Sequence, residues 1–208
     1  MNRQYRFQRH IYDATRTHYL AWRQKLIDDL KIEDGNVVEI ACGTGWNLIR
    51  AAKTYPAARV FGLDISTEML VTARAKIAAE GLSSSVQLAQ ADATTFDLNS
   101  LFGFREADRI FISYALSMIP EWPAVIERAA TCITPQGALH IVDFGPMDRM
   151  SGLSKQMLRG WLAHYNVTPR DDLHSVLLSL AQRLDLTVAV EHSRSGYCSY
   201  AILRRFDP

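Results

Sequence analysis

The stretch that most constrains the fold covers residues 37–48 and reads VVEIACGTGWNL. It begins as an apolar β-type run, passes through a turn of small residues and continues as a segment compatible with a helix. Glycines at 43 and 45 let the backbone approach a ligand closely, because no Cβ atom stands in the way. The helix presents its N–H groups and the positive end of its dipole to an anionic group. We therefore predict a ligand-binding strand–turn–helix unit, although an ordinary tight turn gives the same pattern.

A second apolar run, residues 59–65, contains Asp64 near its end, about twenty residues after the glycines. In a doubly wound α/β sheet this position lies beside the first turn, where a carboxylate accepts hydrogen bonds from both hydroxyls of a ribose. The alternative is that Asp64 is a turn residue or a helix N-cap, since Ser66 and Glu68 follow it. The combined strand–turn–helix–strand context favours the ribose contact.

Leu48 stands where a dinucleotide-binding fingerprint has its third glycine. That glycine makes room beside a pyrophosphate, so its replacement favours a ribose-bearing ligand without a pyrophosphate. At this point the residues resemble the first motif of class I S-adenosylmethionine-dependent methyltransferases, an acidic residue followed by Gly-x-Gly-x-Gly. Glu39, Gly43 and Gly45 match that motif, and Ala41 replaces its first glycine.

Two further segments resemble later motifs of the same family. Residues 62–66 (GLDIS) resemble the second motif, and residues 90–93 (QADA) resemble the third, whose aspartate, here Asp92, usually faces the adenine amino group. Met69 either packs on the adenine ring or belongs to the core. The resemblance implies S-adenosylmethionine as cofactor, S-adenosylhomocysteine as product and no metal. The implied cofactor-binding residues are Glu39, Gly43, Thr44, Gly45, Asp64, Ile65, Met69, Asp92, Ala93, Ser113 and Arg23.

The order of apolar runs and helical patterns predicts an α/β fold in a single domain, residues 1–208. We expect a doubly wound, Rossmann-like sheet of seven strands, with helices on both faces and an antiparallel last strand, as is typical of this methyltransferase fold. Strands are expected at 37–40, 59–65, 86–91, 108–113 and 137–143, a hairpin at 187–191 and 197–204, and helices at 67–80, 124–133 and 173–184.

The N-terminal segment, residues 1–30, is basic and aromatic. Residues 1–25 have a net charge of about +5 and include five aromatic side chains. Such a mixture suits either an anionic membrane surface or a helical lid that closes over the cofactor with its rings near the sulfonium. A solvated helix with a few core aromatics is the alternative.

Residues 146–170 interrupt the alternation of strands and helices. They contain several methionines and leucines, one tryptophan and four cations. Methionine and leucine suit an acyl chain, and the cations suit an anionic head group, so we interpret the segment as a substrate-specifying insertion. A surface helix with one buried stripe is the alternative.

Composition excludes several function classes. A net charge of +1 gives no nucleic-acid footprint over the whole domain. The three cysteines show neither a disulfide framework nor metal-ligand spacing, and no apolar run is long enough to span a bilayer. We expect a cytoplasmic protein, peripheral at the inner face of the membrane; the oligomeric state stays open.

Residues 11–16 (IYDATR), the stretch to Arg23, residues 43–48 and residues 113–120 (SYALSMIP) give a closer resemblance, to the bacterial betaine-lipid N-methyltransferases. It implies N-methylation of diacylglyceryl-homoserine at an anionic membrane surface. Because ligands bind outside the carboxyl ends of strands, Tyr114 should face the reaction centre, and we place Tyr114 and Tyr12 beside the amine as catalytic candidates. The alternatives are another phospholipid, a soluble amine, a quinone precursor, or cofactor binding without catalysis.

Overall fold

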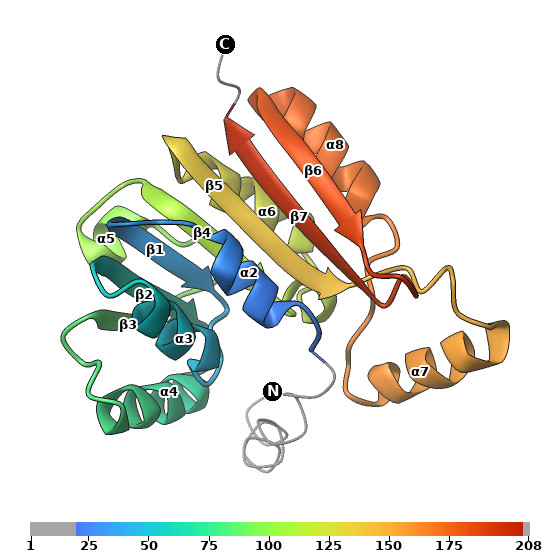
Figure 1. The fold of residues 1–208 in the computed structure, drawn as a ribbon, viewed down its shortest axis with the longest axis horizontal. Coiled ribbons are helices and arrows are strands. Elements are labelled where there is room, and N and C mark those ends of the chain that lie inside the picture. The colour runs from blue at the N-terminus through green and yellow to red at the C-terminus, as the bar shows by residue number, and fades with distance from the viewer. Residues whose placement is uncertain (1–19, 206–208) are drawn as a thin grey trace.

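Seven strands form one mixed sheet in the order β3-β2-β1-β4-β5-β7-β6 (Figure 1). The structure, a computed structural model, describes residues 20–205. The strands are β1 (Gly35–Ile40), β2 (Ala58–Asp64), β3 (Val86–Gln90), β4 (Ala107–Ser113), β5 (Ile133–Phe144), β6 (Leu186–His192) and β7 (Cys198–Arg205). Pairs from β3 to β5 are parallel, whereas β7 runs antiparallel to both β5 and β6. The predicted sheet with its antiparallel last strand is confirmed.

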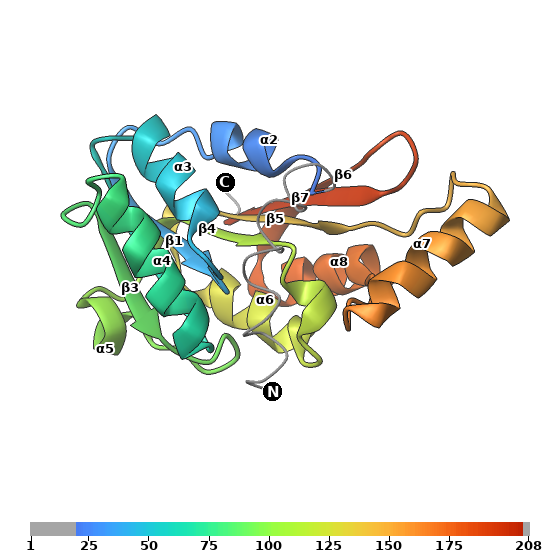
Figure 2. The ribbon, with the colours of Figure 1, turned by 90° about the horizontal axis from the view of Figure 1, so that it is seen from below.

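Helices cover both faces of this sheet, as predicted (Figure 2). They are α2 (Arg23–Asp29), α3 (Trp46–Thr54), α4 (Thr67–Ala79), α5 (Leu98–Phe102), α6 (Trp122–Thr131), α7 (Gly152–His164), α8 (Leu173–Leu184) and the 3₁₀ turn η1 (Leu116–Met118). One core cluster joins α2, α3 and α4 to the sheet, and the other joins α5, α6 and α8 to it. Val37 belongs to the first cluster and Val38 to the second, because successive strand side chains point to opposite faces.

Two predicted boundaries were wrong near the centre of the chain. The helix expected at 124–133 is α6, which begins at Trp122 and ends at Thr131. Pro123 lies in its first turn, where a missing N–H breaks no helical hydrogen bond. Strand β5 already begins at Ile133, because a register shift in its pairing with β4 accommodates the extra residues before Ala138.

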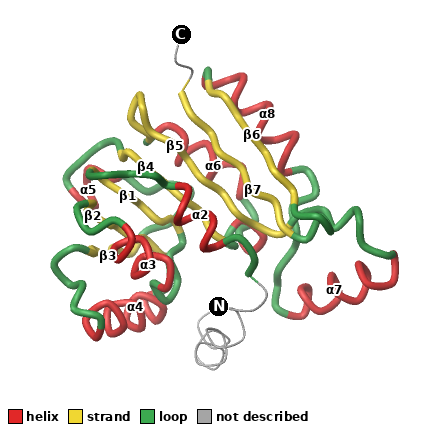
Figure 3. Tube along the Cα trace, viewed as in Figure 1, coloured by secondary structure: helices red, strands yellow, loops and turns green. Residues whose placement is uncertain are grey.

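Helix α7 lies beyond the carboxyl end of β5 and apart from the sheet (Figures 1 and 2). Loops connect it to the sheet and to α8 on its two sides (Figure 3). Residues 146–170 therefore lie outside the sheet, as the sequence predicted. Within residues 20–205, no helix is both long enough and apolar enough to cross a membrane.

Candidate active site

The turn after β1 adopts the backbone conformation that its glycines predicted. Gly43 and Gly45 have φ angles of +53° and +78°. A Cβ atom on Gly43 would meet no atom within 4 Å, so this side of the turn is open to a ligand, whereas one on Gly45 would lie 3.1 Å from the Cβ of Ala73 in α4. Gly45 is thus also required for close packing between α3 and α4. Ala41, in place of the first glycine of the motif, also has a positive φ, of 56°.

Asp64 ties this turn to the end of β2. Its Oδ2 atom accepts a hydrogen bond from the backbone N–H of Gly43 at 2.8 Å, and its Oδ1 atom accepts one from that of Ser66 at 2.8 Å. The N-cap of α4 is Ser66 rather than Asp64, because the Ser66 hydroxyl accepts a hydrogen bond from the N–H of Met69. Burial raises the pKa of Asp64, while the hydrogen bonds from Ser66 and Gly43 oppose that shift.

Glu39 is buried behind the same turn, with 1% of its surface exposed. Its Oε1 atom accepts a hydrogen bond from the Nδ2 of Asn47 at 2.5 Å, and the Oδ1 of Asn47 accepts one from the Nε of Arg23 at 2.9 Å. Its Oε2 atom is buried and has no hydrogen-bond partner among the described residues. Desolvation raises the pKa of Glu39 to about 8, against the lowering effects of Asn47 and Arg23.

Asn47 is a site residue that the sequence did not single out. It lies in the first turn of α3 and is 4% exposed. The guanidinium carbon of Arg23 also lies 4.1 Å from the ring centroid of Trp46, which precedes Asn47 in the chain. The only signal for Asn47 in the sequence was its position as a polar residue in a helical turn that must pack against the sheet. Its partners, Glu39 and Arg23, lie in other elements of the chain.

The loops after β2 and β3 lie against each other. The N–H of Ala91 donates to the carbonyl oxygen of Asp64 at 3.1 Å, and the side chain of Gln90 donates to that of Ile65 at 3.1 Å. The side chain of Ile65 is 66% exposed, an unusual position for an isoleucine and a suitable surface for a planar ring. The third-motif carboxylate, Asp92, is exposed and accepts hydrogen bonds from the N–H and hydroxyl of Thr94, which hold its pKa below the usual value.

The remaining cofactor candidates lie along the same loops. Thr44 is buried within the turn, and Met69 is 6% exposed, so its side chain packs within the protein. Ala93 is half-buried beside Asp92. Ser113, at the end of β4, has a buried hydroxyl that lacks a hydrogen-bond partner in the described part of the chain.

Tyr114 follows Ser113 and has a φ of +53°. Its side chain is 2% exposed, packs edge-on against the ring of Phe144 and donates its hydroxyl proton to the carbonyl oxygen of Ala21 at 2.8 Å. Burial raises the pKa of Tyr114 well above that of an ordinary tyrosine, so the phenol is neutral at physiological pH. The hydroxyl thus holds the segment that leads into α2. Tyr12, the second catalytic candidate, lies outside the described residues.

The segment after α7 is fastened to the loop that follows Tyr114. The N–H of Thr168 donates to the carbonyl oxygen of Ser117 at 2.8 Å. The guanidinium of Arg170 donates to the carbonyl oxygens of Leu116 at 3.0 Å and Ile119 at 2.8 Å. Residues 146–170 therefore adjoin the carboxyl end of β4, where an acceptor substrate is expected.

The edge of the sheet formed by these loops fits the cofactor that the motifs imply. The unpartnered Oε2 of Glu39 suits an ammonium group, and the start of α3, which no described side chain caps, suits a carboxylate. Each carboxylate oxygen of Asp64 has a further lone pair for a ribose hydroxyl. No group of three or more His, Cys, Asp or Glu side chains in residues 20–205 is arranged to hold a metal ion.

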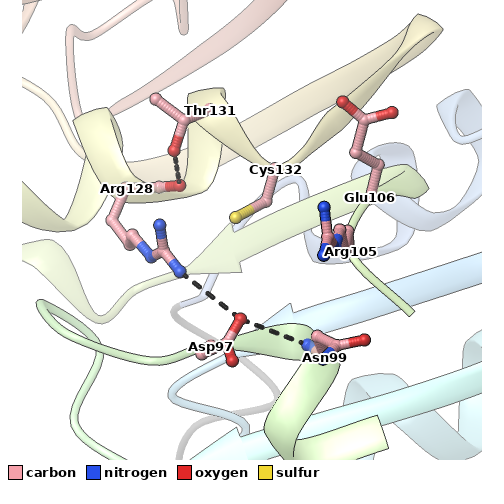
Figure 4. A pocket seen from close by; sticks show the side chains of 7 residues that line it. All are labelled: Asp97, Asn99, Arg105, Glu106, Arg128, Thr131 and Cys132. Atoms are coloured by element: carbon pink, nitrogen blue, oxygen red, sulfur yellow. Dashed lines mark hydrogen bonds and ion pairs between the residues drawn. The ribbon is translucent and has the colours of Figure 1, made fainter. Parts of the chain in front are cut away.

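A solvent-open cavity of about 420 Å³ lies elsewhere, near the amino ends of β4 and β5 (Figure 4). Charged side chains dominate its lining, including those of Asp97, Arg105, Glu106 and Arg128. Because ligands of open α/β sheets bind at the carboxyl ends of the strands, this cavity is not part of the candidate active site.

Comparisons with known proteins found similarity to methyltransferases. Residues 37–137 match a family described as a methyltransferase domain. The demethylmenaquinone methyltransferase of Listeria monocytogenes is 25% identical over 150 residues, which cover 71% of this chain and 57% of the relative. That of Geobacillus stearothermophilus is 27% identical over 121 residues, 57% of this chain and 50% of the relative. The chain thus spans less than two thirds of the length of these relatives.

Solved structures share the fold over nearly the whole chain. An O-methyltransferase family protein from Burkholderia thailandensis has a TM-score of 0.71 at 19% identity, covering 93% of this chain and 59% of its own. The plantazolicin methyltransferase BpumL, in complex with a substrate analogue and S-adenosylhomocysteine, has a TM-score of 0.74 at 16% identity, covering 99% of this chain and 92% of its own. Residues 37–137 therefore match a methyltransferase domain, and nearly the whole chain has the fold of solved methyltransferases.

Proposed function

Because residues 37–137 match a methyltransferase domain, we propose that the chain transfers the methyl group of S-adenosylmethionine to the amine of a membrane-lipid head group. The proposed acceptor is diacylglyceryl-homoserine, and the product is the trimethylated betaine lipid. The observation that carries this choice is the segment 146–170, which combines apolar side chains with cations and is fastened to the loop after β4. The resemblance of residues 11–16 and 113–120 to betaine-lipid N-methyltransferases supports the same choice.

The cofactor, when bound, supplies an electrophilic methyl group on a sulfonium. In this proposal Glu39 accepts a hydrogen bond from its ammonium group, and Asp64 accepts hydrogen bonds from its ribose hydroxyls. Ile65 would contact the adenine ring and Asp92 its amino group, while Arg23 and the start of α3 would attract the carboxylate of the cofactor. These residues bind and orient, which is the main requirement of an in-line displacement.

On the acceptor side, the amine must lose a proton before its nitrogen forms the new bond to carbon. Tyr114 does not serve as the base, because its neutral phenol already donates to Ala21 and its pKa is raised. We propose that the proton passes to water. We propose that Tyr114 shapes the acceptor side by fixing the segment before α2, and that Tyr12 borders the amine, where a ring face stabilises the cationic product.

A quinone precursor is the second candidate acceptor. It is favoured by the two demethylmenaquinone methyltransferases that match this chain. Methylation would then form a bond to a ring carbon rather than to a nitrogen. Both candidates are lipids, so a lipid-soluble product alone does not distinguish them.

The deciding experiment supplies methyl-labelled S-adenosylmethionine to the purified protein with either diacylglyceryl-homoserine or a demethylated menaquinone. We expect label in a lipid with a quaternary nitrogen and none in the quinone. Label only in the quinone would overturn the lipid-amine proposal and favour the second candidate. Cofactor binding without label in either acceptor would overturn both.

A further inference from the structure

Helix α7 exposes large apolar side chains along one side. Leu153, Met157, Trp161 and Tyr165 are 71%, 69%, 42% and 38% exposed. They follow one another at intervals of four residues, so they form one continuous stripe along α7 and the residue after it. Single exposed apolar residues are normal, whereas a continuous exposed stripe indicates an interaction surface.

The opposite side of α7 already has its own contacts with the protein. Leu162 is 2% exposed and belongs to the core cluster under α2, α3 and α4, with Leu158 packed against that cluster. The guanidinium of Arg159 donates to the carbonyl oxygen of Pro146 and pairs with Asp171. The apolar stripe therefore faces away from the body of the protein, on a helix that projects from it (Figure 2).

Cations predominate around the stripe, although Asp148 precedes them and Asp171 pairs with Arg159. Residues 149–170 contain four cations, Arg149, Lys155, Arg159 and Arg170, and no aspartate or glutamate. The rings of Trp161 and Tyr165 pack against each other with centroids 5.2 Å apart. Aromatic rings and basic side chains beside an apolar stripe are the composition of helices that lie in the plane of an anionic bilayer surface. The excess of cations favours an anionic surface over a second copy of the chain, whose α7 would carry the same charge.

We propose that α7 docks the protein on an anionic bilayer, with Leu153, Met157 and Trp161 inserted at the boundary between head groups and acyl chains. Because Thr168 and Arg170 fasten this segment to the loop after β4, docking places the acceptor side of the active site at the membrane. The proposal rests on the proposed function, which requires a membrane surface. Its test needs neither cofactor nor acceptor, so failure of the docking proposal can be distinguished from failure of the proposed function.

The test is flotation of the purified protein with phosphatidylcholine vesicles, prepared with or without phosphatidylglycerol. We expect flotation with the anionic vesicles and weak flotation with the neutral ones. The double variant Leu153→Ser/Met157→Ser should lower the partition coefficient about tenfold or more, because two apolar side chains no longer leave water. The matched control is Val71→Ser/Leu178→Ser, which changes two exposed apolar residues on α4 and α8 and should float like the wild type.

Tryptophan fluorescence supplies an independent readout. Anionic vesicles should shift the emission of the wild type to the blue, and Trp161→Phe should remove that shift while Trp22, Trp46 and Trp122 remain. Absence of flotation, equal flotation of the double variant, or a shift that survives Trp161→Phe would each overturn the proposal. A dimer in gel filtration that the double variant converts to a monomer would show instead that a second copy covers the stripe. An unchanged far-UV circular dichroism spectrum confirms that each variant is folded.

Discussion

The carboxylate of Asp64 accepts a hydrogen bond from the backbone N–H of Gly43 at 2.8 Å, across 21 positions of the sequence. This contact joins the end of β2 to the turn after β1, so one side chain fixes the relative position of two motifs. Asp64 therefore has a structural task in addition to its proposed contact with the ribose. Its replacement should affect both.

We predict that Asp64→Asn weakens binding of S-adenosylhomocysteine by about ten- to a hundredfold, since a hydrogen bond to a charged group is lost (roughly 1.5–3 kcal/mol). Isothermal titration calorimetry measures the change. Asp97→Asn is the control, because Asp97 likewise accepts hydrogen bonds from two backbone N–H groups, at the start of α5, but lies far from the turn. An Asp64→Asn variant with wild-type affinity would exclude Asp64 from the cofactor site.

Ala41 gives a prediction about stability alone. Its φ of 56° lies in the left-handed region, where an alanine is strained and a glycine is not. Ala41→Gly should raise the free energy of unfolding by about 0.5–1 kcal/mol, after allowance for the greater entropy of the unfolded chain. Ala51→Gly, within α3, should lower it by about 1 kcal/mol or more, because that position is helical and buried. Urea denaturation of both variants checks the opposite signs.

Glu39 predicts a pH dependence of cofactor binding. With its pKa raised to about 8, most of this carboxyl is protonated at neutral pH in the ligand-free protein, whereas an ammonium group binds the ionised form. Affinity for S-adenosylhomocysteine should therefore rise between pH 6 and pH 8, by at most about tenfold per pH unit, with release of a proton. Glu39→Gln should bind more weakly and without this dependence. A wild-type affinity that is constant over that range would contradict the assignment.

The same group affects stability in the opposite direction. Between its unfolded value of 4.5 and about 8, the folded protein retains a proton that the unfolded chain has released, so stability falls as pH rises. The slope is at most about 1.4 kcal/mol per pH unit. Burial also raises the pKa of Asp143, to about 6, so more than one carboxyl group contributes to the pH dependence of stability in the wild type. The difference between the denaturation profiles of wild type and Glu39→Gln isolates the contribution of Glu39, and identical slopes would contradict it.

The sequence predicted those parts of the site that depend on local pattern. Gly43 and Asp64 follow apolar runs at a characteristic spacing, and parallel strands bring their carboxyl ends to one edge of a sheet. Asn47 was missed because its role depends on hydrogen bonds with Glu39 in β1 and Arg23 in α2, which come together only in the folded protein. A helical pattern alone gave no such information.

The orientation of helix α7 is a second feature that the sequence alone did not predict. The sequence predicted a substrate-specifying insertion there, with a surface helix that has one buried stripe as the alternative, and the helix has apolar residues on two sides. Leu162 is buried, whereas Leu153 and Met157 are exposed, and only the contact of Leu162 with the core cluster decides which side of the helix faces the protein. Periodicity indicates that a stripe exists, not what covers it.

Tyr114 supplies the last prediction, because its hydroxyl donates to the carbonyl oxygen of Ala21, 93 positions earlier in the chain. Tyr114→Phe leaves that partly buried carbonyl without its donor, so we expect stability to fall by about 1–2 kcal/mol. If the segment before α2 shapes the acceptor side as proposed, turnover should fall about tenfold or more, while affinity for S-adenosylhomocysteine is unchanged. Methyl-transfer kinetics and calorimetry separate the two effects.

Tyr200→Phe is the matched control. Its hydroxyl pairs with buried His140 at 2.7 Å, so stability should fall similarly while turnover is unchanged. Wild-type turnover in Tyr114→Phe would restrict this hydroxyl to a structural role, and a loss of turnover in Tyr200→Phe would show that the effect is not specific to the acceptor side.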